Sequence, residues 1–174
     1  MWNALRTFEA GTFSSWLREG NFIIEPFATY YVLLGLHAIG MAAVVGICFM
    51  LTSRILGFQL SLPMTAAGRL LQLAWWGFYL NLASGILLIM AQPRREGMTP
   101  LFWAKMAFVV LAVIAMYIIG KGLAAVRPVA NGRGGVIEVA PWGIRIAAVT
   151  VDLAWLLAIV SGRLVGYTQP PPPF

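Results

Sequence analysis

Four long stretches of the chain are almost continuously apolar. A helix that crosses a membrane needs about 20 mainly apolar residues, and each of the four stretches is long enough. We therefore predict an all-α membrane protein with a bundle of four transmembrane helices. The predicted helices cover about residues 27–52, 70–91, 101–120 and 142–165.

Helix start and stop signals flank these stretches. Pro26 stands at the first turn of the first helix, and Arg54 follows its predicted end. Thr99 is a suitable N-cap for the third helix, because Pro100 then occupies the first helical position, where proline is favoured. The run Pro170–Pro173 cannot remain helical, so the fourth helix must end before it.

The chain outside the bundle divides into two short segments. Residues 1–25 mix apolar and charged side chains, which favours a helix or broken helix that lies in the headgroup region. Residues 26–167 form the predicted bundle, and residues 168–174 form a proline-rich tail. The apolar positions of the first segment are Trp2, Leu5, Phe8, Phe13, Trp16 and Leu17.

The longest loop lies between the third and fourth helices, over residues 122–141. Two valine-rich pieces flank Asn131 and Gly132, a pair that favours a tight turn, so we predict a short surface hairpin here. A phosphate-binding loop is the alternative for this glycine-rich segment. It is disfavoured because neither a strand-to-helix context nor a following Gly-Lys-Ser/Thr is present.

Composition supports the membrane assignment. The chain is 60% hydrophobic and 10% charged, with a mean hydropathy of +0.83, whereas soluble domains are about half apolar and a quarter charged. The net charge of +6 fits basic residues near lipid headgroups rather than a nucleic-acid partner. Cys48 is the single cysteine of the chain, so it cannot form an intramolecular disulfide.

Four crossings place both termini on the same side of the membrane. The basic residues divide evenly between the two sides, six against six, before distance from the helices is considered. Arg6 lies too far from the first helix to count fully, because the positive-inside rule applies near helix ends. Without Arg6, five basic residues lie on the side of the termini and six on the opposite side. The side with six is assigned to the cytoplasm, which places both termini on the non-cytoplasmic side.

Three polar residues fall near the middle of predicted helices, where hydrocarbon makes them costly. They are His37, Asn81 and Asp152. If the helices are level, His37 and Asp152 differ in height by roughly 7–8 Å, a gap that side chains, Asn81 or one water could close. We interpret the three as a mid-membrane polar cluster. It acts either as a clasp between helices or as a proton relay, ion path or ligand site.

His37 is also a candidate metal or haem ligand. Met41 lies one turn further along the same face, and histidine with methionine suits copper or a haem iron. Cys48 lies about 16 Å along the helix from His37, too far to share an ion. The chain has no second histidine, so bis-histidine haem ligation would need a second chain. No cofactor is predicted from these residues alone; haem and copper remain alternatives.

Other residues suggest packing or interfacial roles. Small residues at a spacing of four favour close helix packing, inside the bundle or against a partner: they are Ala38, Ala42 and Gly46. Glu25 and Arg163 lie on the same predicted membrane side and could form an interfacial ion pair. Lys105 is close enough to a helix end to extend its ammonium to the interface. Neither a nucleophile–base pair nor paired carboxylates are visible, so we expect no enzyme.

Short motifs throughout the bundle resemble a family of small bacterial four-helix membrane proteins. The likeness covers most of the chain from about Phe27 onward. The matching segments are 37–40, 45–46, 53–57, 75–78, 84–85, 100–102 with Lys105, and 161–164 with Tyr167. The family is distantly similar to the membrane domain of copper-resistance D-type proteins. The resemblance therefore implies a bacterial inner-membrane location and, at most, an association with copper or redox chemistry.

The chain departs from this family pattern at two positions. Leu34 stands where members often carry a glutamate, three residues before the histidine. Ser53 stands where members often carry an acidic residue, before the arginine at the helix exit. If those acids assist a site in relatives, Asp152 would have to replace them here.

The sequence thus favours one function and leaves two others open. The favoured function is an accessory or scaffolding subunit of a larger bacterial membrane complex, for example an energy-converting one. It follows from the lack of catalytic residues, the small extramembrane mass and the small-residue helix face. The alternatives are a small transporter or proton path through the mid-membrane polar residues, and a haem- or copper-binding electron carrier centred on His37.

Overall fold

The protein is a bundle of four long helices. The computed structural model describes residues 7–8, 10–19, 29–58, 63, 66–93, 99–131 and 135–168. The four helices are α3 (Thr29–Leu56), α4 (Ala67–Ala91), α6 (Pro100–Gly122) and α7 (Trp142–Thr168). All four are long and apolar enough to cross a membrane, so this is a multi-pass integral membrane protein.

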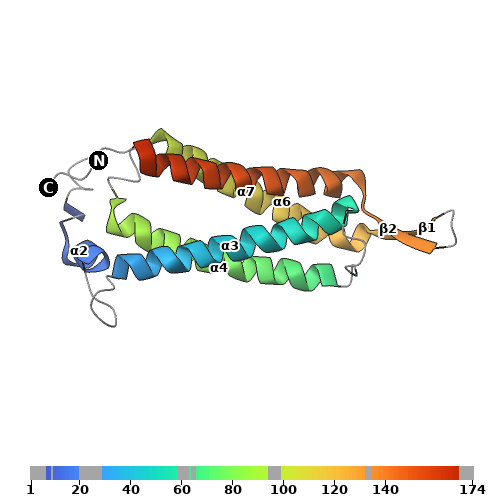
Figure 1. Cartoon of the computed structure of the whole chain (residues 1–174), viewed down its shortest axis with the longest axis horizontal. Helices are drawn as coiled ribbons and strands as arrows, with labels where there is room; N and C mark the ends of the chain where they lie inside the picture. The colour runs from blue at the N-terminus through green and yellow to red at the C-terminus, as the bar shows by residue number, and fades with distance from the viewer. Residues whose placement is uncertain are drawn as a thin grey trace.

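The bundle consists of two antiparallel hairpins. Helix α3 packs along α4, and α6 packs along α7, whereas contacts between the two hairpins run mainly from α3 to α7. Figure 1 shows that the hairpins approach each other near the β-strands and diverge toward the end where both chain termini lie. The molecule is therefore closed at one end and open between its hairpins at the other.

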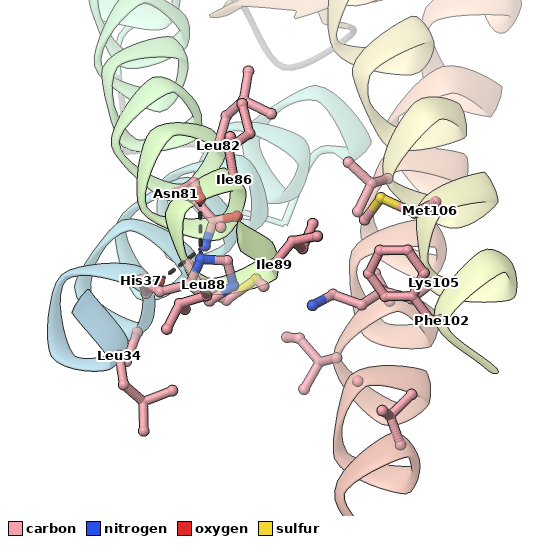
Figure 2. A pocket seen from close by; sticks show the side chains of 18 of the residues that line it. Leu34, His37, Asn81, Leu82, Ile86, Leu88, Ile89, Phe102, Lys105 and Met106 are labelled. Atoms are coloured by element: carbon pink, nitrogen blue, oxygen red, sulfur yellow. Dashed lines mark hydrogen bonds between the residues drawn. The ribbon is translucent and has the colours of Figure 1, made fainter. Parts of the chain in front are cut away.

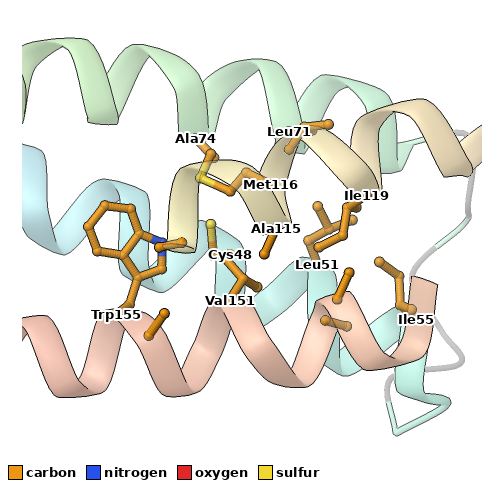
Figure 3. Packing of buried hydrophobic residues seen from close by; sticks show 14 of the residues in the cluster. Cys48, Leu51, Ile55, Leu71, Ala74, Ala115, Met116, Ile119, Val151 and Trp155 are labelled. Carbon is orange, nitrogen blue, oxygen red and sulfur yellow. The ribbon is translucent and has the colours of Figure 1, made fainter. Parts of the chain in front are cut away.

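The main core fills the closed end. On α3 it contains Val44, Cys48, Leu51 and Ile55, which repeat at three- and four-residue spacing and so share one face. Figure 3 shows Cys48 and Leu51 meeting Met116 and Ile119 of α6. The outer faces are also apolar: Ile39, Phe49 and Trp76 are each more than 60% exposed. Their exposure fits contact with lipid, which carries no penalty for apolar side chains.

Glycines set the close approach of α3 to α4. A Cβ added at Gly40 would lie 2.7 Å from the backbone nitrogen of Asn81, and one added at Gly77 would lie 2.9 Å from that of Val44. The predicted packing face is different. Ala38, Ala42 and Gly46 are exposed, and a Cβ added at Gly46 would meet nothing within 4 Å. Ala42 and Gly46 therefore face away from the bundle, whereas Ala38 lines the pocket between the hairpins.

Helix α3 extends beyond its predicted end. Arg54 lies inside the last turn and is 6% exposed, because Ile55 still belongs to the core and continues the helix past it. The helix ends at Gly57, whose φ is +92°. Phe58 N–H donates to the Ser53 carbonyl (2.9 Å) and Gly57 N–H to the Arg54 carbonyl (3.1 Å), which is a Schellman motif.

A short helix near the N-terminus, α2 (Thr12–Glu19), packs against the end of α4. The Ser14 hydroxyl is buried and lies 3.0 Å and 3.1 Å from the carbonyl oxygens of Met90 and Ala91, to which it donates. Those carbonyls belong to the last turn of α4, where the helix itself supplies no partner. Phe13 and Trp16 stack on the outer side of α2 and are exposed.

A two-stranded ribbon and a 3₁₀ turn, η2 (Leu123–Ala125), connect α6 to α7. Strands β1 (Arg127–Asn131) and β2 (Gly135–Val139) pair antiparallel, which confirms the predicted hairpin. Its register differs from the prediction, because Asn131 pairs with Gly135 and so belongs to the strand rather than to a two-residue turn. The proline-rich tail after Thr168 lies outside the described residues, as does most of the chain before Thr12.

Candidate functional site

A cleft lies between the two hairpins at the open end of the bundle. Its volume is about 490 Å³, within the range of pockets that hold small molecules. One wall comes from α3 and α4 and the other from α6 and α7 (Figure 2). Most of the lining is aliphatic or aromatic, and four residues give it polar or charged side chains in addition to Tyr30. These four are His37, Asn81, Lys105 and Arg163.

His37 and Asn81 hold each other through two hydrogen bonds. The His37 Nδ1 lies 3.0 Å from the Asn81 carbonyl oxygen, and the Asn81 amide donates to the His37 carbonyl over 2.9 Å. The Ser84 hydroxyl lies 3.3 Å from the same ring nitrogen. The ring also lies against Gly85, where an added Cβ would come within 3.0 Å of Cε1. These contacts fix the orientation of the imidazole.

The hydrogen bond to Asn81 determines which ring nitrogen of His37 carries the proton. A carbonyl oxygen only accepts, so Nδ1 must donate to it. In the neutral imidazole Nε2 then holds a lone pair, and it can accept a hydrogen bond, take up a proton or bind a metal. His37 lines the cleft, and Figure 2 shows its ring extending toward the opposite wall.

Lys105 approaches His37 from the other wall. Figure 2 shows its side chain crossing toward α3 and α4, where the positive charge of the ammonium opposes a positive charge on the imidazole. The stem lies along Gly162 of α7, where an added Cβ would be 3.5–3.6 Å from Cδ, Cε and Nζ. The expectation that Lys105 extends its ammonium to the interface stays a prediction, and within the bundle the side chain turns into the cleft. The reason is tertiary: the divergence of the hairpins opens a space beside Lys105, which its side chain enters.

Arg163 lies at the edge of the cleft and is exposed. Its predicted partner, Glu25, is outside the described residues, so this ion pair stays a prediction. Arg163 is five residues from the end of α7, and Lys105 is five residues from the start of α6. Both therefore lie about 7–8 Å from the helix ends, near the depth of lipid headgroups.

Asp152 does not join His37 and Asn81. Its carboxylate accepts a 2.6 Å hydrogen bond from Thr52, fifteen residues beyond His37 on α3. The separation along the helix is about 22 Å rather than 7–8 Å. The prediction assumed level helices, but α3 continues to Leu56 and the helices are staggered. The expected three-residue cluster is thus a pair, His37 with Asn81, and a separate contact between Asp152 and Thr52.

Two further buried groups lie between these sites. Trp155 is fully buried, and its indole N–H has no hydrogen-bond partner among the described residues. Cys48 is 2% exposed and lies beside it in the core (Figure 3). Both belong to the packed end of the bundle, so they separate the Asp152 carboxylate from the cleft.

The side chains of the cleft can be compared with the ligands that haem or copper needs. A ligating histidine commonly donates its second N–H to a backbone carbonyl, as His37 does here. Met41 lines the same wall and Met106 the opposite one, so thioether ligands are also available. These residues fit one axial ligand of a haem or a soft His–Met copper site. Within the described residues, no three His, Cys, Asp or Glu side chains come together.

Sequence reasoning found His37, Asn81 and Asp152. It missed Lys105, which faces His37 across the cleft, and Thr52, which donates to Asp152. Lys105 was discounted because it is near a helix end, a position where lysines usually reach water. Thr52 carries little sequence signal, since a threonine hydroxyl usually bonds within its own helix. Both assignments depend on which helices face each other and at what height, and those relations come from the tertiary structure.

Comparison with family models, with curated proteins and with solved structures finds no match. The resemblance to small bacterial four-helix membrane proteins and to copper-resistance D-type proteins therefore stays a prediction. The functional argument below depends on the geometry of the cleft.

Proposed function

We propose that this integral membrane protein binds a lipid-soluble small molecule in the cleft between its two helix hairpins. The observation that carries the proposal is the orientation of His37. Its ring is fixed by Asn81 and extends into a cleft of about 490 Å³ that is otherwise mostly apolar. An apolar pocket with a few convergent polar groups is the usual form of a small-molecule site.

The cost of these polar groups supports a functional role. An ionisable side chain within a membrane span is expensive, so it is retained where it forms a specific contact. A clasp between α3 and α4 would need the His37–Asn81 pair alone. It would not need a lysine on the opposite hairpin that reaches toward the same imidazole.

The test uses two glycines of α7 with open surroundings. Gly166 lines the cleft and Gly143 does not, and an added Cβ at either meets nothing within 4 Å. Gly166→Phe should therefore fill the cleft, whereas Gly143→Phe should point into surrounding lipid or water. Each protein is purified in lipid nanodiscs, and its bound small molecules are extracted and identified by mass spectrometry.

We expect a small molecule to co-purify with the wild type and with Gly143→Phe, and to be depleted at least several-fold in Gly166→Phe. Equal recovery from all three proteins would refute binding in the cleft. Absorption spectra of the same samples test the haem alternative. A haem band that disappears in His37→Ala would identify the bound molecule as a haem and His37 as its ligand.

A role as an accessory subunit is the second candidate, favoured by the outward-facing surface of α3. Ala42 and Gly46 are exposed there and are spaced for close approach of another transmembrane helix, and Ala38, one turn earlier, borders the cleft. The partner would be another membrane-protein subunit in the bacterial inner membrane. Ala42→Leu should reduce stoichiometric co-purification of such a subunit, and purification of the wild type alone would remove this candidate.

A further inference from the structure

We propose that the ligand of the cleft is a single-chain amphiphile with an acidic head group, held by Lys105 and Arg163. This inference rests on the proposed function and specifies the chemistry of the ligand. The apolar chain would lie between the hairpins. The acidic group would lie at the cleft edge, near the ends of α6 and α7.

The side chains that line the cleft carry a net positive charge. Among the described residues that line the cleft, the two with permanent charge are Lys105 and Arg163, and both are positive. A concave site with one sign of charge and apolar walls concentrates the opposite charge. An acidic head group therefore gains attraction here that a neutral lipid of the same length does not.

The depth of the two cations supports an amphiphile over a small inorganic anion. Both lie about 7–8 Å from the helix ends, at the boundary between headgroups and hydrocarbon. Below them the lining is apolar apart from His37 and Asn81. Met41, Phe78, Val109 and Ala158 face the cleft from all four helices. A ligand with an acidic end and an apolar body matches a cleft with cations at its edge and apolar side chains below them.

The position of the Lys105 ammonium is set by Gly162. The aliphatic stem and Nζ of Lys105 are in ordinary van der Waals range of a Cβ added at this glycine. A side chain larger than that of alanine would therefore displace the ammonium. Gly162 is thus a positioning residue for Lys105. His37 lines the same cleft, and its Nε2 can accept a hydrogen bond from a protonated head group or take up its proton.

The cleft volume limits the number of chains. A volume of about 490 Å³ is that of a pocket for one drug-sized molecule. We therefore assign it to one chain, in preference to the two acyl chains of a bilayer phospholipid. An anionic phospholipid would satisfy the cations equally well, so the experiment must separate the two.

The experiment measures binding of radiolabelled palmitate to the full chain in nanodiscs of zwitterionic phosphatidylcholine. Methyl palmitate is the neutral probe of the same chain length, and phosphatidylglycerol, added at the same concentration as palmitate, is the two-chain competitor. The variants are Lys105→Gln and Arg163→Gln. Lys121→Gln is the matched control, because Lys121 is exposed at the opposite end of α6 and does not line the cleft.

We expect palmitate to bind more tightly than its methyl ester, and Lys105→Gln or Arg163→Gln to weaken palmitate binding about ten- to hundred-fold, the range for a lost charge-assisted hydrogen bond. Neither variant should change binding of the ester. Lys121→Gln should bind palmitate as the wild type does, and Lys105→Arg should retain most of the affinity. Gly162→Leu should weaken palmitate binding while leaving ester binding in place.

Several results would overturn the inference. Equal affinity of the wild type for acid and ester, or no effect of either charge variant, would show that the protein does not recognise the head group. Competition by phosphatidylglycerol at equal concentration would assign the cleft to a bilayer lipid. Failure of Gly166→Phe to block either probe would instead refute the proposed function, since the site would then lie outside the cleft. Thermal melting of each variant separates lost binding from lost folding.

Discussion

Each polar side chain within the spans of this protein was costly to place there, and the structure shows how several of them are satisfied. His37 and Asn81 exchange hydrogen bonds with each other's backbone, and Thr52 donates to Asp152. In hydrocarbon each group would otherwise be an unsatisfied donor or acceptor. The cost is on the order of several kcal/mol, the free energy of transferring a polar group from water to an apolar medium. Local pairing therefore explains much of the register between helices.

The pair of Thr52 and Asp152 gives a prediction at this scale. Thr52→Val removes a hydroxyl that is buried and donates to the carboxylate over 2.6 Å. The carboxylate would lose this donor, so we expect stability to fall by about 1–3 kcal/mol. The measurement is the free energy of unfolding in detergent micelles, determined by titration with denaturant.

A double-mutant cycle tests whether the pairing itself is responsible. Thr52→Val together with Asp152→Leu should be less destabilising than the sum of the two single changes, because no unpaired group remains. Ser53→Ala is the control, since the Ser53 hydroxyl bonds to a carbonyl of its own helix and is not buried. Additive effects within about 0.5 kcal/mol would contradict coupling between the two residues.

At the scale of the helix, α3 shows how an element is terminated inside a membrane protein. The core face continues through Ile55, and Gly57 then takes up a left-handed conformation that closes the Schellman motif. The motif satisfies two carbonyls that the end of the helix would otherwise leave unpaired. A non-glycine residue at this position carries a steric penalty, because its Cβ approaches the following carbonyl oxygen.

The steric penalty at positive φ predicts that alanine has opposite effects on stability at Gly57 and at Gly46. Gly57→Ala should destabilise the protein by about 1–2 kcal/mol, because φ is +92°. Gly46→Ala should leave stability unchanged or raise it slightly. It lies within the helix, and an added Cβ meets nothing within 4 Å. Thermal unfolding of the two variants in the same detergent checks both. A stable Gly57→Ala protein would argue against the terminating conformation.

At the scale of the whole molecule, the bundle is two hairpins joined at one end. Small residues of α7 fill the joined end, where Ala147, Ala148 and Ala154 are almost fully buried against the neighbouring helices. Larger and polar residues line the other end, where the hairpins diverge around the cleft (Figure 1). The unequal packing is what makes a binding site possible in so small a membrane protein.

The arrangement predicts which segments are reached from each side of the membrane. Helix α2 and the β-ribbon lie at opposite ends of the bundle, so Thr7→Cys and Asn131→Cys should be labelled from opposite sides by a membrane-impermeant maleimide. Cys48 is 2% exposed and should stay unlabelled until the protein is denatured. The proposed orientation expects Thr7→Cys to react from the non-cytoplasmic side. Labelling of both engineered cysteines from one side would contradict four crossings.

Local patterns in the sequence were enough to predict the fold class, the four helices and the connecting hairpin. These features depend on local patterns: long apolar runs, a capping Thr99 before Pro100, and turn residues between two valine-rich pieces. The sequence also identified His37, Asn81 and Asp152 as costly polar groups. These inferences hold because the bilayer imposes the same requirement on every segment that crosses it.

The tertiary structure decided how those groups combine. The stagger between α3 and α7 places Asp152 beside Thr52, and the divergence of the hairpins turns Lys105 toward His37. Apolar length constrains each helix to span the membrane, but it leaves the sliding and rotation of one helix against another nearly free. Those are set by close contacts such as the approach of Gly40 to Asn81, which depend on both helices at once.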